Sequence, residues 1–300
     1  MAPNVRPRRS MLYMPGSEAR KLEKARTLDA DAFIFDLEDA VDPARKPEAR
    51  DTVAAALAEG GYAPREVLVR INGLDTDWGV ADLRMAARAG ADGVLIPKVE
   101  SPDTVRQVVR LLDQAGAPEG LGVWCMIETP RGVLDVRPIA ESSSRLAGFV
   151  MGTADLAKDL HAFHTPDRLP LLTSLSLAVL AARANGLAVI DGVHLDLNDA
   201  EGFEQACLRG LEMGMDGKSL IHPKTVGTAN RVFAPTEHEV AEARRVAEAW
   251  DQREEGAGVV VVDGRLVERL HAENARRIIA LEDAIKALER EVLTRQGGAG

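Results

Sequence analysis

Residues 93–127 read GVLIPKVESPDTVRQVVRLLDQAGAPEGLGVWCMI and contain the pattern that governs most of the chain. Two short apolar runs, Gly93–Ile96 and Gly122–Ile127, enclose a longer segment, Thr104–Ala115, whose apolar residues recur at helical spacing. Neither run alternates with polar residues, which is typical of strands in a parallel sheet that is covered on both faces. The stretch therefore predicts a strand, a helix and a second, parallel strand.

The same pattern repeats along the first 220 residues, with further helical segments at Ala19–Ala30, Ala44–Glu59 and Trp78–Ala89. The turn after the first strand, Pro15-Gly16-Ser17, lacks the G-x-G-x-x-G spacing that a doubly wound open sheet usually carries there. We therefore predict an α/β fold, a (β/α)8 TIM barrel, which typically needs about 250 residues. Its eight predicted strands are Ser10–Met14, Ala32–Phe35, Glu66–Val69, Gly93–Ile96, Gly122–Ile127, Ala147–Met151, Leu187–Ile190 and Gly217–Ile221.

Beyond Asn230 the pattern changes, so we expect a barrel over residues 1–230 and a C-terminal helix–hairpin–helix extension over residues 231–300. Thr236 followed by Glu239 is a capping box that begins a helix of roughly twenty residues. Residues 258–267, GVVVVDGRLV, predict a hairpin, and a last amphipathic helix is expected over residues 269–292. We expect the extension to pack on a neighbouring subunit; the alternative is that it folds back on its own barrel.

The composition argues against several classes of partner. A net charge of −10 disfavours nucleic acid, whose phosphates require clustered Lys and Arg. The two cysteines, Cys125 and Cys207, lack the spacing of a disulfide framework or a zinc site. No apolar run approaches the ~18 residues of a membrane helix, and no signal-peptide core precedes the first strand. We expect a cytoplasmic enzyme.

Ionisable side chains follow nearly every predicted strand, at the barrel end where TIM-barrel enzymes carry their active sites. Burying so many charges is costly unless they pair or bind an ion. Glu38 and Asp39 are candidate catalytic residues beside Arg70, which cannot deprotonate and would act as a fixed donor to a carbonyl or enolate oxygen. The residues at this rim are Asp36, Glu38, Asp39, Arg70, Lys98, Glu128, Asp155, Asp191 and His222.

Carboxylates without a cysteine cluster are the ligands that Mg²⁺ prefers. Glu128 and Asp155, after neighbouring strands, are the candidate metal pair, unless both merely form salt bridges with Arg70 or Lys98. Lys98 leaves a second chemistry open, a Schiff-base aldolase without a metal, but that reaction leaves the two carboxylates unexplained.

The histidines carry weaker signals. His222 precedes a proline and is as readily a structural residue as a ligand. His161 and His164 lie in residues 156–171, a segment long enough to cover the site as a lid, and neither has a partner at zinc-site spacing.

Six motifs stand in order at the predicted strand ends: SMLYMPGS (10–17), FDLEDAV (35–41), VRINGLD (69–75), LIPKVE (95–100), IET (127–129) and IHP (221–223). Together they resemble the citrate lyase β-subunit-like family of the HpcH/HpaI aldolase superfamily. This family includes malyl-CoA and citramalyl-CoA lyases and malyl-CoA thioesterases. The match extends over the barrel and the extension.

The resemblance implies Mg²⁺, with Mn²⁺ as a substitute, held by Glu128 and Asp155, and Arg70 polarising the carbonyl of a CoA thioester. It also implies a homotrimer or hexamer in which the extension caps a neighbour's active site, with CoA lying over the barrel mouth. The residues that it places near the substrate or CoA are Tyr13, Lys24, Arg70, Gly152, Ala154, Ile221, His222 and Pro223.

One position departs from the lyases of this family, which carry an Asp after the hairpin that protonates the enolate in the neighbouring site. The matching residue here is Glu268. One extra methylene moves the carboxylate by about 1 Å, and such a displacement can cost roughly a hundredfold in rate. With Glu at this position, the sequence resembles the malyl-CoA thioesterase branch of the family, in which the thioester is hydrolysed. Glu268 could also be a surface residue at a helix start that pairs with a nearby Arg.

Three functions remain open. The leading hypothesis is a Mg²⁺-dependent lyase that cleaves or forms the C–C bond of a short carboxylated 3-hydroxyacyl-CoA, with a keto acid and an acyl-CoA as products. The second is a (3S)-malyl-CoA thioesterase. The third is the β subunit of a multi-subunit citrate lyase, inactive by itself.

Overall fold

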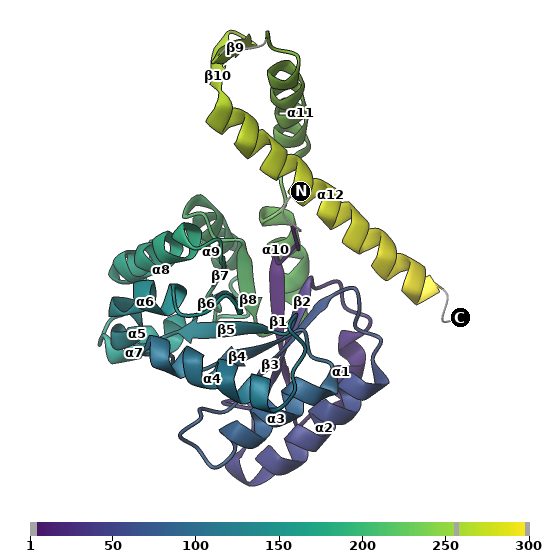
Figure 1. The fold of residues 1–300 in the computed structure, drawn as a ribbon, viewed down its shortest axis with the longest axis vertical. Helices are drawn as coiled ribbons and strands as arrows, with labels where there is room; N and C mark the ends of the chain where they lie inside the picture. Colours follow the sequence, from purple (N-terminus) through teal and green to yellow (C-terminus); the bar gives the residue numbers. More distant parts are fainter. Residues whose placement is uncertain (1–4, 255–257, 298–300) are drawn as a thin grey trace. The chain divides into compact units, whose positions relative to one another are not determined.

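The computed structural model describes residues 5–254 and 258–297. The chain divides into two compact units, one of residues 8–230 and one of residues 231–300 together with the segment before Arg8. In the first unit eight parallel strands close into a barrel, because β1 pairs with both β2 and β8 (Figure 1). The predicted α/β barrel is confirmed.

All eight predicted apolar runs overlap a strand of the barrel. Their inward-facing side chains, among them Met11, Ile34 and Leu95, form one buried core inside it. The strands are β1 (Ser10–Pro15), β2 (Ala32–Asp36), β3 (Glu66–Arg70), β4 (Gly93–Ile96), β5 (Gly122–Ile127), β6 (Leu146–Met151), β7 (Ala188–Asp191) and β8 (Gly217–Leu220).

Trp124 is the largest fully buried side chain of this core. Its indole occupies the space beside Gly148, where a Cβ would lie 2.5 Å from Trp124 Cζ3, and it passes close to Gly93, where a Cβ would lie 3.3 Å from Cδ1. The guanidinium of Arg8, which pairs with Glu66, covers the indole at 4.9 Å. Arg8 precedes β1, so this end of the barrel is closed and the opposite end is left for a site.

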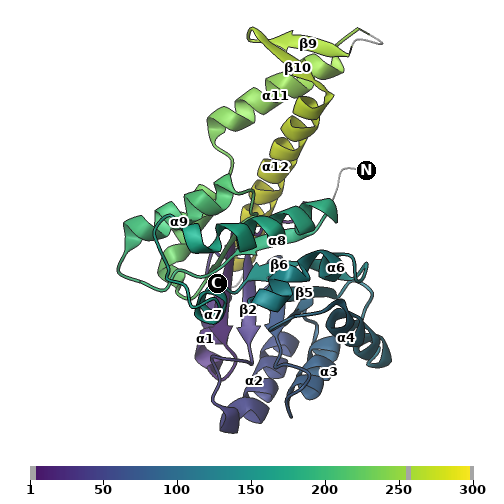
Figure 2. The same ribbon diagram turned by 90° about the vertical axis from the view of Figure 1, so that its left-hand side faces the viewer.

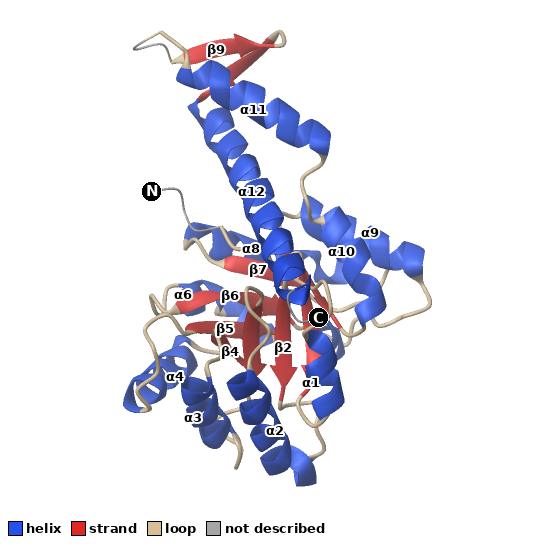
Figure 3. Cartoon of the chain, turned by 90° about the vertical axis from the view of Figure 1, so that its right-hand side faces the viewer, coloured by secondary structure: helices blue, strands red, loops and turns tan. Residues whose placement is uncertain are grey.

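Helices enclose the barrel on its outside (Figures 2 and 3). Within the described ranges, no helix is both long and apolar enough to cross a membrane. The helices of the first unit are α1 (Ala19–Ala25), α2 (Lys46–Glu59), α3 (Gly79–Ala89), α4 (Pro102–Gln114), α5 (Pro130–Leu134), α6 (Val136–Ala140), α7 (Thr153–Asp159), α8 (Leu172–Ala184), α9 (Ala200–Glu212) and α10 (Val226–Val232), and short 3-10 turns lie at Pro43–Arg45, Leu169–Leu171 and Pro223–Thr225.

The predicted length of the first helix was wrong, since α1 ends at Ala25 rather than Ala30. The reason is a buried arginine from a distant part of the chain. Arg65 donates hydrogen bonds to the carbonyl oxygens of Arg26 and Leu28 at 2.9 and 2.7 Å. These carbonyls would otherwise be left without partners at a helix end, and their capture by Arg65 ends the helix.

The second unit contains α11 (Glu237–Asp251), β9 (Val259–Val262), β10 (Arg265–Glu268) and α12 (Arg269–Gly297), as the helix–hairpin–helix pattern predicts. The capping box at the start of α11 is present, but this helix has 15 residues rather than twenty. Trp250, Val267 and Ala272 form a small core between its elements.

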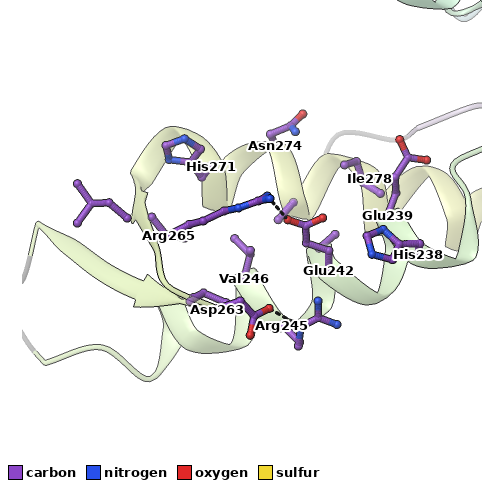
Figure 4. A pocket seen from close by; sticks show the side chains of 15 residues that line it. His238, Glu239, Glu242, Arg245, Val246, Asp263, Arg265, His271, Asn274 and Ile278 are labelled. Atoms are coloured by element: carbon purple, nitrogen blue, oxygen red, sulfur yellow. Dashed lines mark hydrogen bonds and ion pairs between the residues drawn. The ribbon is translucent and has the colours of Figure 1, made fainter.

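A pocket of about 540 Å³ lies between α11, the hairpin and the start of α12. Figure 4 shows two ion pairs across it, Arg245 with Asp263 at 3.1 Å and Arg265 with Glu242 at 3.4 Å. Asp263 and Gly264 both have positive φ, as the two central residues of a type I′ hairpin turn require.

Candidate active site

A cavity of about 430 Å³ opens at the end of the barrel where the strands finish. Most of the side chains predicted for the site line it, and they come from the ends of several strands, the usual position of an active site in this fold. The predicted residues that line the cavity are Tyr13, Asp39, Arg70, Glu128, Gly152, Ala154, Asp155 and Ile221.

Arg70 is held at the cavity by a carboxylate on the neighbouring strand. Asp36 and Arg70 face each other in the β2–β3 register, and Arg70 Nε and Nη2 donate to the two Asp36 oxygens at 2.7 and 2.5 Å. The Tyr13 ring lies 4.9 Å from the guanidinium. Burial opposes the charge of Arg70, but Asp36 holds its pKa well above the usual value. Arg70 is therefore a fixed cation at the site.

Glu38 lies between two cations. One oxygen contacts Arg70 Nη1 at 2.9 Å, and the other accepts a hydrogen bond from Lys98 Nζ at 2.8 Å. Burial raises the pKa of Glu38 against the opposing effect of Arg70 and Lys98. Burial lowers the pKa of Lys98, but the hydrogen bond to Glu38 and the charges of Glu38, Asp39 and Glu128 together outweigh it, and the net shift is upward. A lysine kept charged in this way is a poor nucleophile, so the geometry disfavours a Schiff base.

Glu128 and Asp155 both line the cavity, Glu128 directly after β5 and Asp155 in the first turn of α7, which follows β6. Glu128 is 1% exposed, and its Oε1 accepts a hydrogen bond from the backbone N–H of Lys98 at 2.7 Å. Burial raises the pKa of Glu128 to about 7, and the charges of Glu38 and Asp155 also act upward. Gly152 makes room for this carboxylate, because a Cβ there would overlap Glu128 Cβ and Oε2.

Neither Glu128 nor Asp155 is neutralised by an ion pair with Arg70 or Lys98 in the described part of the chain, residues 5–254 and 258–297. A buried carboxylate beside a second one is short of positive charge, which fits a hard divalent cation. The same ranges contain no cluster of three or more His, Cys, Asp or Glu suited to a metal, so an ion here would complete its shell with water or substrate oxygens.

The remaining predicted residues lie away from the cavity lining. Lys24 is on the exposed face of α1, and His222 begins a 3-10 turn in which its Nδ1 accepts a hydrogen bond from the Lys224 backbone. Pro223 is the first residue of that turn. Glu268 ends β10 in the second unit, where it is exposed and its backbone N–H donates to His271 Nδ1. The contacts of these four residues with substrate stay predictions.

Three other predicted residues are not among those that line the cavity. Asp191 at the end of β7 is fully buried and pairs with Lys218 at 2.6 Å and Arg168 at 2.5 Å. His164 lines a second cavity of about 450 Å³ next to Arg168. His161 is exposed, in a left-handed turn after α7.

Asp36 orients Arg70, a role that the sequence pattern did not predict. Besides the two bonds to Arg70, Asp36 accepts hydrogen bonds from the backbone N–H groups of Glu38 and Ala40. It thus fixes both the guanidinium and the loop that carries Glu38 and Asp39. The pairing of strand-end residues across adjacent parallel strands was the signal that would have revealed it.

Comparison with known proteins agrees with this geometry. The family model for HpcH/HpaI aldolase/citrate lyase matches residues 9–223. A (3S)-malyl-CoA thioesterase of Cereibacter sphaeroides KD131 is 46% identical over 288 residues, which cover 96% of this chain and 99% of that protein. The citrate lyase subunit beta of Escherichia coli K12 is 37% identical over 92% of this chain and 93% of its own length.

Solved structures show the same likeness. CitE from Mycobacterium tuberculosis, in complex with magnesium, acetoacetate and coenzyme A, superposes with a TM-score of 0.73 at 27% identity, over 91% of this chain and 97% of its own. RipC from Yersinia pestis has a TM-score of 0.66 at 32% identity, over 77% of this chain and 97% of its own.

Proposed function

The chain belongs to the HpcH/HpaI aldolase/citrate lyase family, and we propose that it is a Mg²⁺-dependent lyase acting on a short carboxylated 3-hydroxyacyl-CoA such as malyl-CoA. The reaction would cleave or form the C–C bond between a keto acid and an acyl-CoA. The observation that carries the proposal is one cavity lined by Glu128, Asp155 and the fixed cation Arg70. The magnesium and coenzyme A in the similar CitE structure support it.

Glu128 and Asp155 would hold the magnesium ion. Mg²⁺ usually takes one or two carboxylate ligands from a protein, so this pair is sufficient. When bound, Mg²⁺ supplies a Lewis acid for the oxygens of the acid portion of the substrate. Mn²⁺ prefers the same oxygen ligands and would substitute.

In the cleavage direction a base takes the proton of the substrate hydroxyl, and the electron pair of the C–C bond passes into the thioester as an enolate. Arg70 faces this oxygen as a preorganised cation, an interaction worth several kcal/mol in such sites. Glu38 is already shared between Arg70 and Lys98, whereas the side chain of Asp39 is 61% exposed. Asp39 is thus the freer base of the two.

The enolate carbon then takes a proton and leaves as the acyl-CoA. We assign this proton to Glu268 from a neighbouring subunit of a trimer or hexamer. CoA would lie across the barrel mouth near Tyr13, Gly152, Ala154 and Ile221, with Lys24, His222 and Pro223 toward its nucleotide end. Both cysteines are buried, and no disulfide joins them in the described part of the chain, which agrees with a cytoplasmic, reducing environment for the enzyme.

The test is a product assay on malyl-CoA and related esters, with EDTA and after addition of Mg²⁺. We expect glyoxylate and acetyl-CoA from malyl-CoA, loss of turnover with EDTA, and recovery with Mg²⁺. Glu128→Gln should lose about 10²-fold or more, because the buried carboxylate is replaced by a neutral amide. Turnover that persists without a divalent metal rules the proposal out.

A second candidate is hydrolysis of the thioester by the same site. It is favoured by the 46% identity to proteins named (3S)-malyl-CoA thioesterase and by glutamate at position 268. Hydrolysis yields free malate and CoA without glyoxylate, so quantifying both acids in one reaction separates the two activities.

A third candidate is a β subunit of a citrate lyase complex, because relatives with 36–37% identity carry that name. Such a subunit needs partner proteins to act. Turnover of free CoA esters by the isolated chain would exclude this role.

A further inference from the structure

Lys98 combines a strained backbone with two contacts to charged groups of the site. Its φ of 49° is in the left-handed region, which favours glycine because other residues carry a Cβ. Its backbone N–H donates to Glu128 Oε1 at 2.7 Å, and its ammonium donates to Glu38 Oε1 at 2.8 Å. A lysine in a position suited to glycine indicates that its side chain is needed there.

We propose that Lys98 is a positioning residue that sets both halves of the active site by separate routes. The left-handed backbone aims an N–H at Glu128, so that this carboxylate of the metal pair is held in one orientation. The ammonium holds Glu38 from one side while Arg70 holds it from the other. This inference rests on the proposed function and goes beyond it, because neither route needs Lys98 to touch the substrate.

The first route depends on the backbone alone. A residue that cannot adopt a φ near +50° must rotate the peptide plane that carries the N–H, and the bond to Glu128 is then lost. Glycine adopts this conformation without strain, whereas a β-branched residue is a clear outlier there. Lys98→Gly therefore preserves the first route, and Lys98→Val disrupts it.

The second route depends on the ammonium alone. Glu38 is 8% exposed, and Lys98 and Arg70 are the two cations that form ion pairs with its carboxylate in the described part of the chain. Without Lys98 the carboxylate keeps Arg70, while Asp39 repels it. Glu38 Oε2 then keeps Arg70 Nη1 and the backbone N–H of Asp39, but Oε1 loses the ammonium that fixes the rotation of the carboxylate against Arg70. Lys98→Gly and Lys98→Val both remove this contact, whereas Lys98→Arg retains a cation that can reach Glu38.

The experiment measures Mg²⁺ binding by calorimetry, with the metal alone, and kcat with malyl-CoA. For Lys98→Gly we expect kcat to fall about 10- to 100-fold, since misplacement of a catalytic group has that cost, while the Mg²⁺ Kd stays within about threefold. For Lys98→Val the Kd should also rise about 10- to 100-fold. Lys98→Arg should recover kcat to within about threefold of the wild type.

A matched control is Lys286→Met, which removes the ammonium of a similarly exposed lysine–glutamate pair, with Glu282 at 2.7 Å. It should leave both constants unchanged. The inference is overturned if Lys98→Gly keeps its kcat, or if its kcat loss is matched by an equal loss of Mg²⁺ affinity. A purely structural role would lower the Tm of Lys98→Gly and leave the kcat of the folded protein intact.

The failure of this inference can be told from the failure of the proposed function. A wild-type chain that binds Mg²⁺ and turns over malyl-CoA, with Lys98 variants that match it, overturns the positioning role only. A wild-type chain that binds no Mg²⁺ overturns the proposed function, and the role of Lys98 with it. If Lys98→Val does not fold, Lys98→Gly and Lys98→Arg still decide the second route.

Discussion

At the scale of single residues, Gly152→Ala tests the pair Glu128 and Asp155 by adding only one methyl group. The φ of −92° at Gly152 suits any residue, and the three atoms nearest to an added methyl group all belong to Glu128. We expect Gly152→Ala to push the carboxylate aside and weaken Mg²⁺ binding about 10- to 100-fold, as changes around a metal ligand do. Isothermal titration with Mg²⁺ measures this directly.

The control is Gly227→Ala in α10, where nothing lies within 4 Å of the new methyl group. It should bind Mg²⁺ normally and gain about 0.5–1 kcal/mol of stability, because alanine is the better helix residue. Unchanged Mg²⁺ affinity in Gly152→Ala would contradict the assignment of Glu128 as a ligand.

Asp36 provides a second test at this scale. Asp36→Asn keeps the shape of the side chain but leaves the buried guanidinium of Arg70 with less compensating charge. Breaking a buried pair from one side costs about 3–5 kcal/mol, so urea unfolding should show a loss of that size. Asp103→Asn, in the exposed pair with Arg106, should lose less than about 1 kcal/mol. Equal losses of unfolding free energy in both variants would show that the buried Asp36–Arg70 pair contributes no more to stability than an exposed pair.

At the scale of elements, most barrel strands were predictable because they are continuous apolar runs, as is typical of strands buried on both faces. The exception is β8, whose buried residues include Lys218 and Ser219. The end of α1 was not predictable. It is set by Arg65, a residue about forty positions further along the chain, which donates hydrogen bonds to carbonyl oxygens just after α1. Nothing in the sequence around α1 indicates these bonds. Helix ends that depend on a distant side chain lie outside what spacing and capping rules describe.

The same limit applies to the candidate site. The rule that strand ends carry the chemistry brought Arg70, Glu128 and Asp155 to one rim before any coordinates were known. Which carboxylate pairs with which cation depends on strand register and side-chain rotamers. For that reason the bond between Asp36 and Arg70, and the place of Glu38 between two cations, came only from the structure.

The buried ion pair between Asp191 in β7 and Lys218 in β8 predicts how the stability of the protein depends on pH. Burial tends to raise the pKa of Asp191, but Lys218 in β8 and Arg168 outweigh it, and the net shift is downward. The unfolded value is about 3.9, so the folded pKa lies below it. The stabilisation by Asp191 is therefore complete at neutral pH, and it is lost as the pH falls through the folded pKa.

Asp191→Asn measures this contribution. At pH 7 we expect the variant to be less stable than the wild type by about 3 kcal/mol or more, since Lys218 stays buried without its partner. The difference should begin to shrink as the pH falls below the unfolded value of about 4, and it should vanish only below the folded pKa, where the wild-type carboxylate also becomes neutral. Denaturant unfolding from pH 3 to 7 gives the curve. A difference that stays constant or widens in acid would refute the explanation.

At the scale of the whole molecule, the proposed site needs parts of two chains: a barrel with Glu128 and an extension with Glu268. Glu128→Gln and Glu268→Gln should each be inactive alone. After mixing and reassembly, about a quarter of wild-type activity should return, because random pairing brings two intact parts together at one site in four. No recovery after demonstrated subunit exchange would mean that Glu268 does not serve a neighbouring chain.

The packing around Trp124 restricts the evolutionary routes open to this barrel. While the indole is present, a Cβ at Gly148 would lie 2.5 Å from it, and the same Cβ would lie 2.7 Å from the carbonyl oxygen of Ala188. A smaller residue at position 124 removes only the first of these contacts, and a Cβ at Gly93 would still lie 2.9 Å from the carbonyl oxygen of Gly122. Both glycines are therefore held in place by neighbouring backbone as well as by the indole, and a change at position 124 alone does not release them.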